Sequence, residues 1–239
     1  MLTDITIKVL PRPETELTVL LLGLSEAAAA RAMTAAMKSS CDISGAAHLP
    51  AATASRIALG NAACWQGSAT AFRLEGFAPS VAHRKAALES LLQPFAEIAD
   101  LDEPLSRDLW RMIRDVTPFA AAHTGADRPL WRISTAPAQG AEVARLIAET
   151  MAADVMFDWA GGLLWVLLPA LEDAGAAPVR TTLAGVGGHA TLIRAPAAIR
   201  AVVDVFEPQD AALAALTRRV KEGFDPRRIL NPGRMWAGQ

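Results

Sequence analysis

The sequence predicts an α+β protein made of two successive βαββαβ units, whose strands form an antiparallel sheet with helices on one face. Segments with strand and helix periodicity follow this order twice along the chain. The second series opens at Leu130 as the first opens at Leu17, and the equivalent segments follow at similar spacings. Two ferredoxin-like units of this kind can join edge to edge, which removes two exposed sheet edges.

Residues 1–102 form the first predicted unit. Residues 5–10 alternate apolar and polar side chains and predict a strand, and the apolar run 17–24 predicts a second, more buried one. Ser25 can cap the next helix, which runs to about Lys38. The other expected elements are strands at 42–49, 69–76 and 97–101, a helical turn within 52–59, and a helix that Pro79 opens.

Residues 103–129 link the two units through a helix started by Pro104. The second unit spans residues 130–207, with a helix at 141–151 and a weak pattern, broken by proline, after residue 168. Its expected strands are 130–136, 154–159, 163–168 and 189–195. Residues 208–239 form a C-terminal helix and tail, and we expect this helix to start at Pro208 and end at Gly223.

Composition narrows the class of protein. The chain has 23 basic and 25 acidic side chains and a formal charge of −2, so no electrostatic feature indicates binding to nucleic acid or an anionic membrane. No uncharged run reaches the roughly 18 residues that a membrane span needs, and no signal peptide is visible. Cys41 and Cys64 lack metal-ligand spacing, as do the histidines, so we expect reduced thiols, a cytoplasmic location and no metal.

The tail carries the most distinctive motif, F-D-P-R-R-I-L-N-P-G-R, at residues 224–234. Its two prolines prevent a helix, and Asn231-Pro232-Gly233 is typical of a tight turn. From the residues alone, a tail docked on its own domain is the favoured interpretation. The motif also closely resembles the C-terminal signature of FAD-linked oxidases of the vanillyl-alcohol-oxidase type, particularly the FAD-binding subunit of bacterial glycolate oxidase.

The resemblance extends over essentially the whole chain. Residues 2–13 look like the junction that follows the family's flavin domain, and residues 45–50 and 187–192 are similar to the same subunit. The flavin domain and its glycine-rich loop are not in this sequence, so the chain resembles the second half of a flavoprotein. The family's more typical catalytic members carry a paired-histidine metal motif, which this sequence lacks, so a regulatory role stays open beside a catalytic one.

The resemblance implies a domain of an oxidoreductase that acts on a 2-hydroxy acid such as glycolate. FAD is then expected in the intact protein, with Asn231, Pro232, Gly233 and Arg234 near the flavin, and no FAD is expected in this chain alone. The implied partners are a separate flavin-binding domain and other glycolate oxidase subunits. A non-enzymatic small-molecule-binding or subunit-interaction module is the alternative, because tandem ferredoxin-like folds also serve as sensors.

Three side chains are candidates for chemistry. His189 follows two glycines at the start of a strand and could act as a general base, or it could simply bond a carbonyl. Arg132 lies on an otherwise apolar strand and could grip a substrate carboxylate. It could equally pair with Asp154 or Asp158, or be exposed on the open sheet face. Arg194 has the same alternatives.

Overall fold

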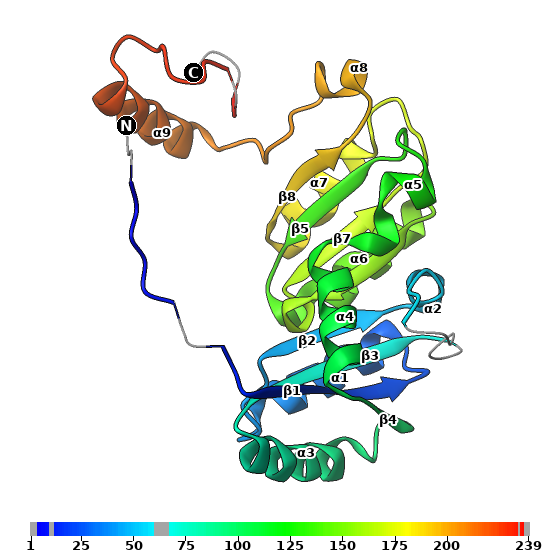
Figure 1. Cartoon of the computed structure of the whole chain (residues 1–239). Helices are drawn as coiled ribbons and strands as arrows, with labels where there is room; N and C mark the ends of the chain where they lie inside the picture. Colours follow the sequence, from blue (N-terminus) through cyan, green and yellow to red (C-terminus); the bar gives the residue numbers. More distant parts are fainter. Residues whose placement is uncertain (1–3, 10–11, 60–66, 234, 237–239) are drawn as a thin grey trace.

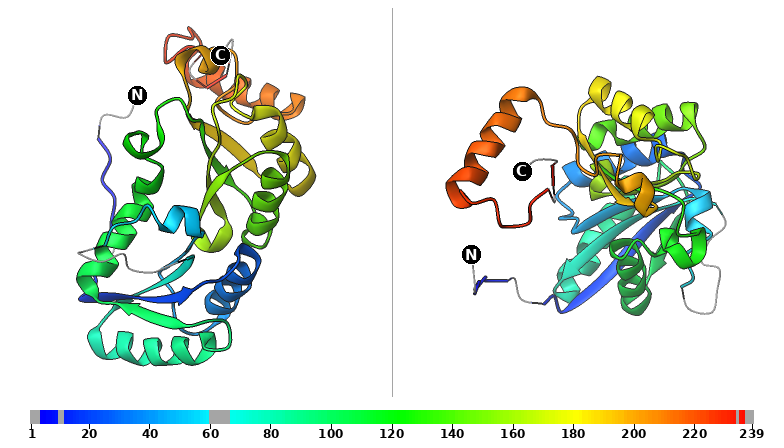
Figure 2. Two further views of the ribbon diagram at one scale, coloured as in Figure 1. Left: turned by 90° about the vertical axis from the view of Figure 1, so that its right-hand side faces the viewer. Right: turned by 90° about the horizontal axis from the view of Figure 1, so that it is seen from above.

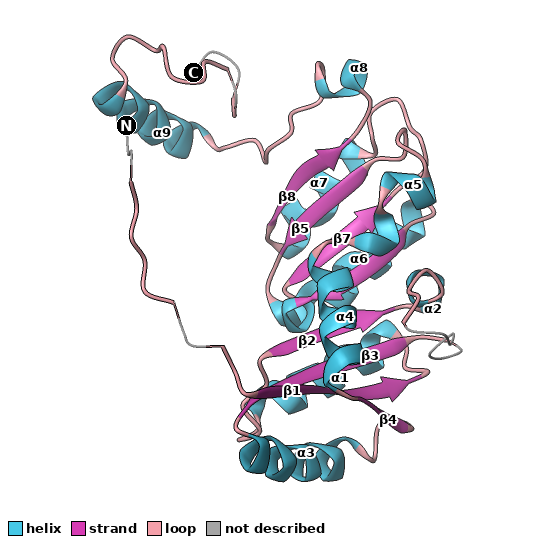
Figure 3. Ribbon diagram, in the orientation of Figure 1, coloured by secondary structure: helices cyan, strands magenta, loops and turns pink. Residues whose placement is uncertain are grey.

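The computed structural model describes residues 4–9, 12–59, 67–233 and 235–236. Its strands form a single eight-stranded sheet in the order β4-β1-β3-β2-β6-β7-β5-β8, and every neighbouring pair is antiparallel (Figures 1 and 3). The strands are β1 Thr15–Leu22, β2 Gly45–Leu49, β3 Ala69–Gly76, β4 Ile98–Leu101, β5 Leu130–Ser134, β6 Asp154–Asp158, β7 Leu163–Leu167 and β8 His189–Arg194. The predicted fold class, with the two sheets joined edge to edge, is confirmed.

The helices of the two units cover one face of the sheet. Two apolar cores lie beneath them, one under α1 and α3 and the other under α6 and α7. These helices are α1 Glu26–Lys38, α3 Ala78–Leu92, α6 Gly140–Thr150 and α7 Ala176–Val186. A third core lies on the opposite face, where Leu109 and Ile113 of the linking helix α4, Glu103–Arg114, pack on the sheet.

Shorter helices occur in the connections and at the end of the chain. They are α2 Ala51–Ala54, α5 Ala121–Thr124, α8 Ala197–Arg200 and α9 Ala211–Phe224, with 3-10 turns at Thr117–Phe119, Pro137–Gln139 and Trp159–Gly161. Helix α7 falls in the stretch where the hydrophobic pattern of the sequence is weak. Pro178 is the third residue of α7, within the first turn, where backbone N–H groups have no partner inside the helix. The proline therefore does not break the helix.

Two predictions about the ends of the chain are wrong. The described part of the expected strand 5–10 pairs with no described strand, and Ile5, Ile7 and Val9 are 71%, 72% and 71% exposed. The C-terminal helix starts at Ala211, because the Asp210 side chain accepts hydrogen bonds from the next two free amides. It then continues through Gly223 to Phe224.

The two units meet where β2 pairs with β6, at His48 and Phe157. Two polar contacts reinforce this joint. The Thr53 hydroxyl donates a 2.7 Å hydrogen bond to the Val155 carbonyl. The Asp154 carboxylate forms ion pairs of 2.8 Å with Arg56 and 3.3 Å with Arg128, so one acidic side chain ties together segments from both units.

His48 is fully buried at this joint, on the face that the helices cover. Its Nδ1 atom forms a 2.9 Å hydrogen bond with the Thr70 hydroxyl, and its ring centre lies 5.7 Å from that of Phe157. Its Nε2 atom has no hydrogen-bond partner among the described residues. Burial lowers the pKa of His48 from 6.5 to about 4, because the cationic imidazole would lose its hydration.

This pKa predicts an acid-sensitive fold. Between pH 6.5 and about 4 the unfolded chain binds a proton at His48 that the folded chain does not, so stability falls as pH drops through this window. The full shift corresponds to about 3 kcal/mol, as an order of magnitude. Urea unfolding of the native chain and of His48→Gln at several pH values measures it. The variant should lose most of this dependence, whereas the matched change at the exposed His189, His189→Gln, should retain it.

Candidate functional site

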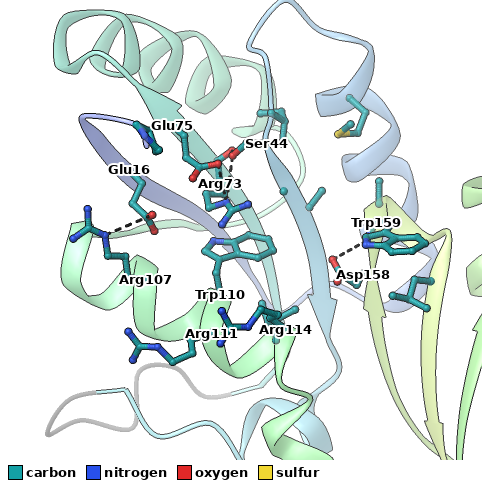
Figure 4. A pocket seen from close by; sticks show the side chains of 18 of the residues that line it. Glu16, Ser44, Arg73, Glu75, Arg107, Trp110, Arg111, Arg114, Asp158 and Trp159 are labelled. Carbon is teal, nitrogen blue, oxygen red and sulfur yellow. Dashed lines mark hydrogen bonds and ion pairs between the residues drawn. The ribbon is translucent and has the colours of Figure 1, made fainter. Parts of the chain in front are cut away.

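A groove of about 870 Å³ lies across the joint between the two units, on the sheet face that carries α4 (Figure 4). This volume is within the range of about 300–1,000 Å³ that is typical of small-molecule sites. Strand register explains its floor. Asp158 pairs with Leu163, and Arg132 pairs with Trp165, and alternation along each strand places all four on this one face.

Trp110 of α4 forms one wall of the groove. Its ring lies against Gly45 of β2, where an added Cβ would come within 3.0 Å of the indole. Its Nε1 atom donates a 2.8 Å hydrogen bond to the Thr18 hydroxyl, which in turn shares a 2.8 Å bond with the Ser106 hydroxyl. Ser106 also lies 3.0 Å from the buried Glu16 carboxylate, to which it donates. This buried chain of hydrogen bonds fixes α4, and with it the wall, on the sheet.

The turn between β6 and β7 forms the opposite wall. Trp159 and Ala160 have left-handed φ angles of 50° and 56°, and such a conformation costs of order 1–3 kcal/mol per residue. Gly161 follows and is in close contact with the start of α6, since a Cβ on Gly140 would lie 2.1 Å from the Gly161 carbonyl oxygen. The packed turn holds the Trp159 indole at the groove, 58% exposed.

Two arginines reach the groove with their guanidinium groups over these indoles. Arg73 lies 5.0 Å from the ring centre of Trp110, and Arg132 lies 5.3 Å from that of Trp159. Such cation–π contacts orient a guanidinium without using its N–H donors. Among the described residues Arg132 forms no hydrogen bond or ion pair, so its donors are available to a ligand.

Asp158 lies on the floor beside these groups (Figure 4). Its Oδ1 atom accepts a 2.7 Å hydrogen bond from the Trp159 backbone N–H, whereas Oδ2 accepts none from a described residue. Burial raises the pKa of this carboxyl, and the amide hydrogen bond and the charge of Arg73 oppose the rise. A half-buried carboxylate of this kind can accept a hydrogen bond or a proton from a bound ligand.

Three further arginines of the groove are paired with acidic side chains. The pairs are Arg107 with Glu103 and Glu16, Arg111 with Asp108, and Arg114 with Asp115. Arg132, the exposed Arg12 and the terminal nitrogens of Arg73 bond no described residue.

The structure separates the residues that the sequence singled out. Arg132 lines the groove. His189 is exposed and, opposite Ser134, shares the sheet face of Arg132 without lining the groove. Arg194 donates to the Phe119 carbonyl at 2.7 Å, the Thr124 hydroxyl at 3.1 Å and the Arg128 carbonyl at 3.2 Å, so it secures a loop. Neither Asp154 nor Asp158 pairs with Arg132.

The tail lies apart from the groove, on α9 (Figure 2). Asp225 holds it there by accepting hydrogen bonds from Lys221 at 2.7 Å and from the backbone N–H groups of Leu230 and Ile229 at 2.9 and 3.1 Å. Lys221 and these amides lower the pKa of Asp225 to about 2. The tail therefore rests on its own helix, and Asn231, Pro232 and Gly233 are exposed at its turn. Arg234 lies outside the described residues.

Helix α9 and the N-terminal segment 4–9 expose several large apolar side chains. Leu216 and Val220 are each 53% exposed and Phe224 is 87% exposed, and in Figure 1 and the right-hand view of Figure 2 α9 stands away from the sheet. Exposed apolar patches of this kind mark surfaces that another protein segment covers.

The described residues contain no cluster of three or more histidine, cysteine, aspartate or glutamate side chains that could hold a metal ion. None of their helices is both long and apolar enough to cross a membrane.

The hydrogen-bond chain under α4 yields a test of the groove wall. Thr18→Val keeps the shape of the side chain but leaves the Trp110 N–H and the Ser106 hydroxyl without their shared partner, which should cost about 1–3 kcal/mol. Thr34→Val is the matched control, because the exposed Thr34 hydroxyl donates only to the Ala30 carbonyl of its own helix. Chemical denaturation measures both variants, and equal stabilities would contradict the role of this chain.

The sequence matches no protein-family model and no curated protein. Two solved structures are similar over 95% of this chain, each at 14% identity. One is p-cresol methylhydroxylase with substrate bound, with a TM-score of 0.62 and 54% of its length covered. The other is 4-ethylphenol oxidase from Gulosibacter chungangensis in complex with isoeugenol, with a TM-score of 0.60 and 55% covered. The chain thus spans about half the length of each enzyme and shares the fold of that half.

Proposed function

We propose that this chain is the C-terminal domain of an FAD-linked oxidoreductase of the vanillyl-alcohol-oxidase type that acts on a 2-hydroxy acid such as glycolate. The resemblance of the tail motif and the fold shared with two enzymes of the oxidase and hydroxylase kind support the class. The observation that carries the substrate class is the groove, where the unpaired donors of Arg132 lie near a carboxylate, Asp158, with one free oxygen.

The groove residues suit the two polar groups of a 2-hydroxy acid. The Arg132 fork can bind the substrate carboxylate through two parallel hydrogen bonds. Oδ2 of Asp158 can accept a hydrogen bond from the hydroxyl and then its proton, and burial, which raises the pKa of this carboxyl, favours the transfer. His189 shares the sheet face of Arg132 and is a second candidate for proton transfer. Arg194 donates its hydrogen bonds to the loop that contains Phe119 and Arg128, so we propose Arg132, and not Arg194, as the main substrate-binding arginine.

FAD, when bound, supplies the acceptor for the hydride that leaves the substrate carbon. Hydride transfer needs the flavin ring next to the groove, whereas the tail turn lies apart from the groove in this structure, so we propose that docking of a flavin domain brings both to the ring. The exposed Asn231 amide offers both a donor and an acceptor, and Pro232 and Gly233 fix the turn that presents it. We propose that a separate flavin-binding domain holds the rest of the dinucleotide and covers the apolar face of α9 and the segment 4–9. Other subunits of a glycolate-oxidase complex are further proposed partners.

A non-enzymatic binding module is the second candidate. The observation that favours it is that this chain alone builds a complete groove, with floor and both walls, so a ligand could bind without a flavin domain. Turnover distinguishes the two, since a binding module takes up a 2-hydroxy acid but never reduces a flavin.

Mixing this chain with a separately expressed flavin domain of a glycolate oxidase and FAD tests the oxidoreductase. Under anaerobic conditions a 2-hydroxy acid should bleach the oxidised-flavin absorbance band. Arg132→Leu should weaken substrate use by about 10- to 100-fold, because a charged hydrogen-bond pair is worth about 1.5–3 kcal/mol. Arg31→Leu, an exposed arginine on α1, is the control and should have no effect. An unbleached flavin with the native chain would refute the proposed activity.

Asn231→Ala tests the tail. The side chain is exposed, but Asn231 has a left-handed φ of 48°, which alanine adopts less readily, so the isolated variant should lose no more than about 1 kcal/mol of stability. In the mixture with the flavin domain, FAD retained through gel filtration should decrease. Arg227→Ala, another exposed change on the same tail, controls for nonspecific loss. If Asn231→Ala unfolds the chain but leaves FAD retention intact, the tail has a structural role only.

A further inference from the structure

Trp159 occupies a backbone position that is unfavourable for a large side chain. Its φ of 50° is left-handed, a conformation that glycine adopts freely and that is an outlier for a bulky residue. Its indole is 58% exposed, so core packing alone does not explain why a tryptophan stands there. Backbone strain at an exposed apolar residue points to a role in the groove that this residue lines.

Two contacts of Trp159 reach the two groups that the proposed chemistry uses. Its backbone N–H donates a 2.7 Å hydrogen bond to Oδ1 of Asp158, which leaves Oδ2 for a ligand (Figure 4). Its indole faces Arg132, whose central guanidinium carbon lies 5.3 Å from the ring centre. One residue therefore contacts both groups, Asp158 through its backbone and Arg132 through its ring.

The turn that carries Trp159 is tied to the strand that carries Arg132. The Gly162 N–H closes the turn by donating to the Trp159 carbonyl at 3.1 Å, and the Thr135 N–H donates to the Gly162 carbonyl at 3.0 Å. Thr135 directly follows β5, the strand of Arg132. The indole and the guanidinium therefore belong to one hydrogen-bonded part of the second unit, independently of the joint with the first.

The indole supplies a contact that restrains the Arg132 guanidinium. Among the described residues this side chain forms no hydrogen bond or ion pair, and the cation–π contact leaves its N–H donors free for a ligand. An arginine without such a contact samples many rotamers. Ordering one flexible side chain on binding lowers affinity by about 2- to 12-fold.

We propose that Trp159 is the positioning residue of the groove. Its indole holds Arg132 ready to bind an anionic group, its amide fixes the Asp158 carboxylate, and the strained turn is what places the ring. That the anionic group is the carboxylate of a 2-hydroxy acid rests on the proposed function, whereas the positioning of Arg132 rests on the contacts of this chain alone.

Two variants separate the effect of the ring from that of the turn. Trp159→Leu and Trp159→Phe both keep the backbone N–H and an apolar side chain, but only phenylalanine keeps an aromatic face. In calorimetric titration of the full chain with lactate, Trp159→Leu should bind about 2- to 12-fold more weakly than the native chain, and Trp159→Phe within about 2-fold of it. Melting temperatures check that both variants are folded.

A double-mutant cycle gives a readout that a purely structural role would not change. Once Arg132→Leu has removed the guanidinium, Trp159→Leu should weaken lactate binding no further, because the two residues act as a pair. In the control background Arg31→Leu, on the exposed face of α1, Trp159→Leu should have its full effect. Additive losses with Arg132→Leu, or equal binding by the Leu and Phe variants, would overturn the inference.

Arginine NMR tests the contact without any ligand. The Nε–Hε signal of Arg132, identified by its loss in Arg132→Leu, should shift when Trp159→Leu removes the ring current, and should shift much less in Trp159→Phe. A signal that stays in place in Trp159→Leu contradicts the positioning role. If Trp159→Leu does not fold, Trp159→Met, which has a flexible apolar side chain, takes its place.

The proposed function can fail independently. A chain whose Arg132 signal responds to the ring, but which binds no 2-hydroxy acid and reduces no flavin, supports the positioning of Arg132 and refutes the oxidoreductase. A reconstituted enzyme that oxidises lactate equally well with Trp159→Leu does the reverse.

Discussion

The pairing of β2 with β6 at His48 and Phe157 turns two four-stranded sheets into one. At this joint, residues of both units line one groove. The floor residue Asp158 belongs to β6, whereas Trp110 lies on Gly45 of β2. The backbone pairing between these two strands is short, so the contact also depends on side chains. These are the buried His48 imidazole on one face and the Asp154 ion pairs at the edge. The strands that join the two units therefore also carry residues of the groove.

The groove owes its residues to the places where the two βαββαβ units differ from each other. The helices of the two units occupy equivalent places on one face, and that face is sealed core. On the other face α4 lies over β1 and β4 of the first unit, so the edge of that helix becomes a wall. The strained turn at Trp159 supplies the facing wall. Strain of this kind persists only where surrounding contacts enforce it, and here the contact of Gly161 with the start of α6 does so.

Periodicity predicted most of the fold. It located both βαββαβ units, because alternation in strands and spacing in helices report which side chains are buried. It missed α7, where Pro178 is harmless in a first turn, and it misplaced the ends of α9, where the Asp210 cap decides the start. Of the site, only Arg132 was found, as an arginine on an apolar strand. The order of the strands and the position of α4 on one face of the sheet bring together the other groove residues, Asp158, Trp159, Arg73 and Trp110. Local sequence spacing predicts neither the strand order nor the position of α4.

The Asp225 contacts bear on how the tail would meet a partner. Ordering a residue costs roughly 1–2 kcal/mol of conformational entropy. Residues 226–230 are already held by the hydrogen bonds of Asp225 and by the 2.6 Å bond from Lys221 to the Leu230 carbonyl. This entropy is already lost when the chain folds. A partner that docks on the tail therefore does not have to order these residues, and less of its interaction energy is offset on binding. Residues 226–230 are thus preorganised on α9, apart from the sheet.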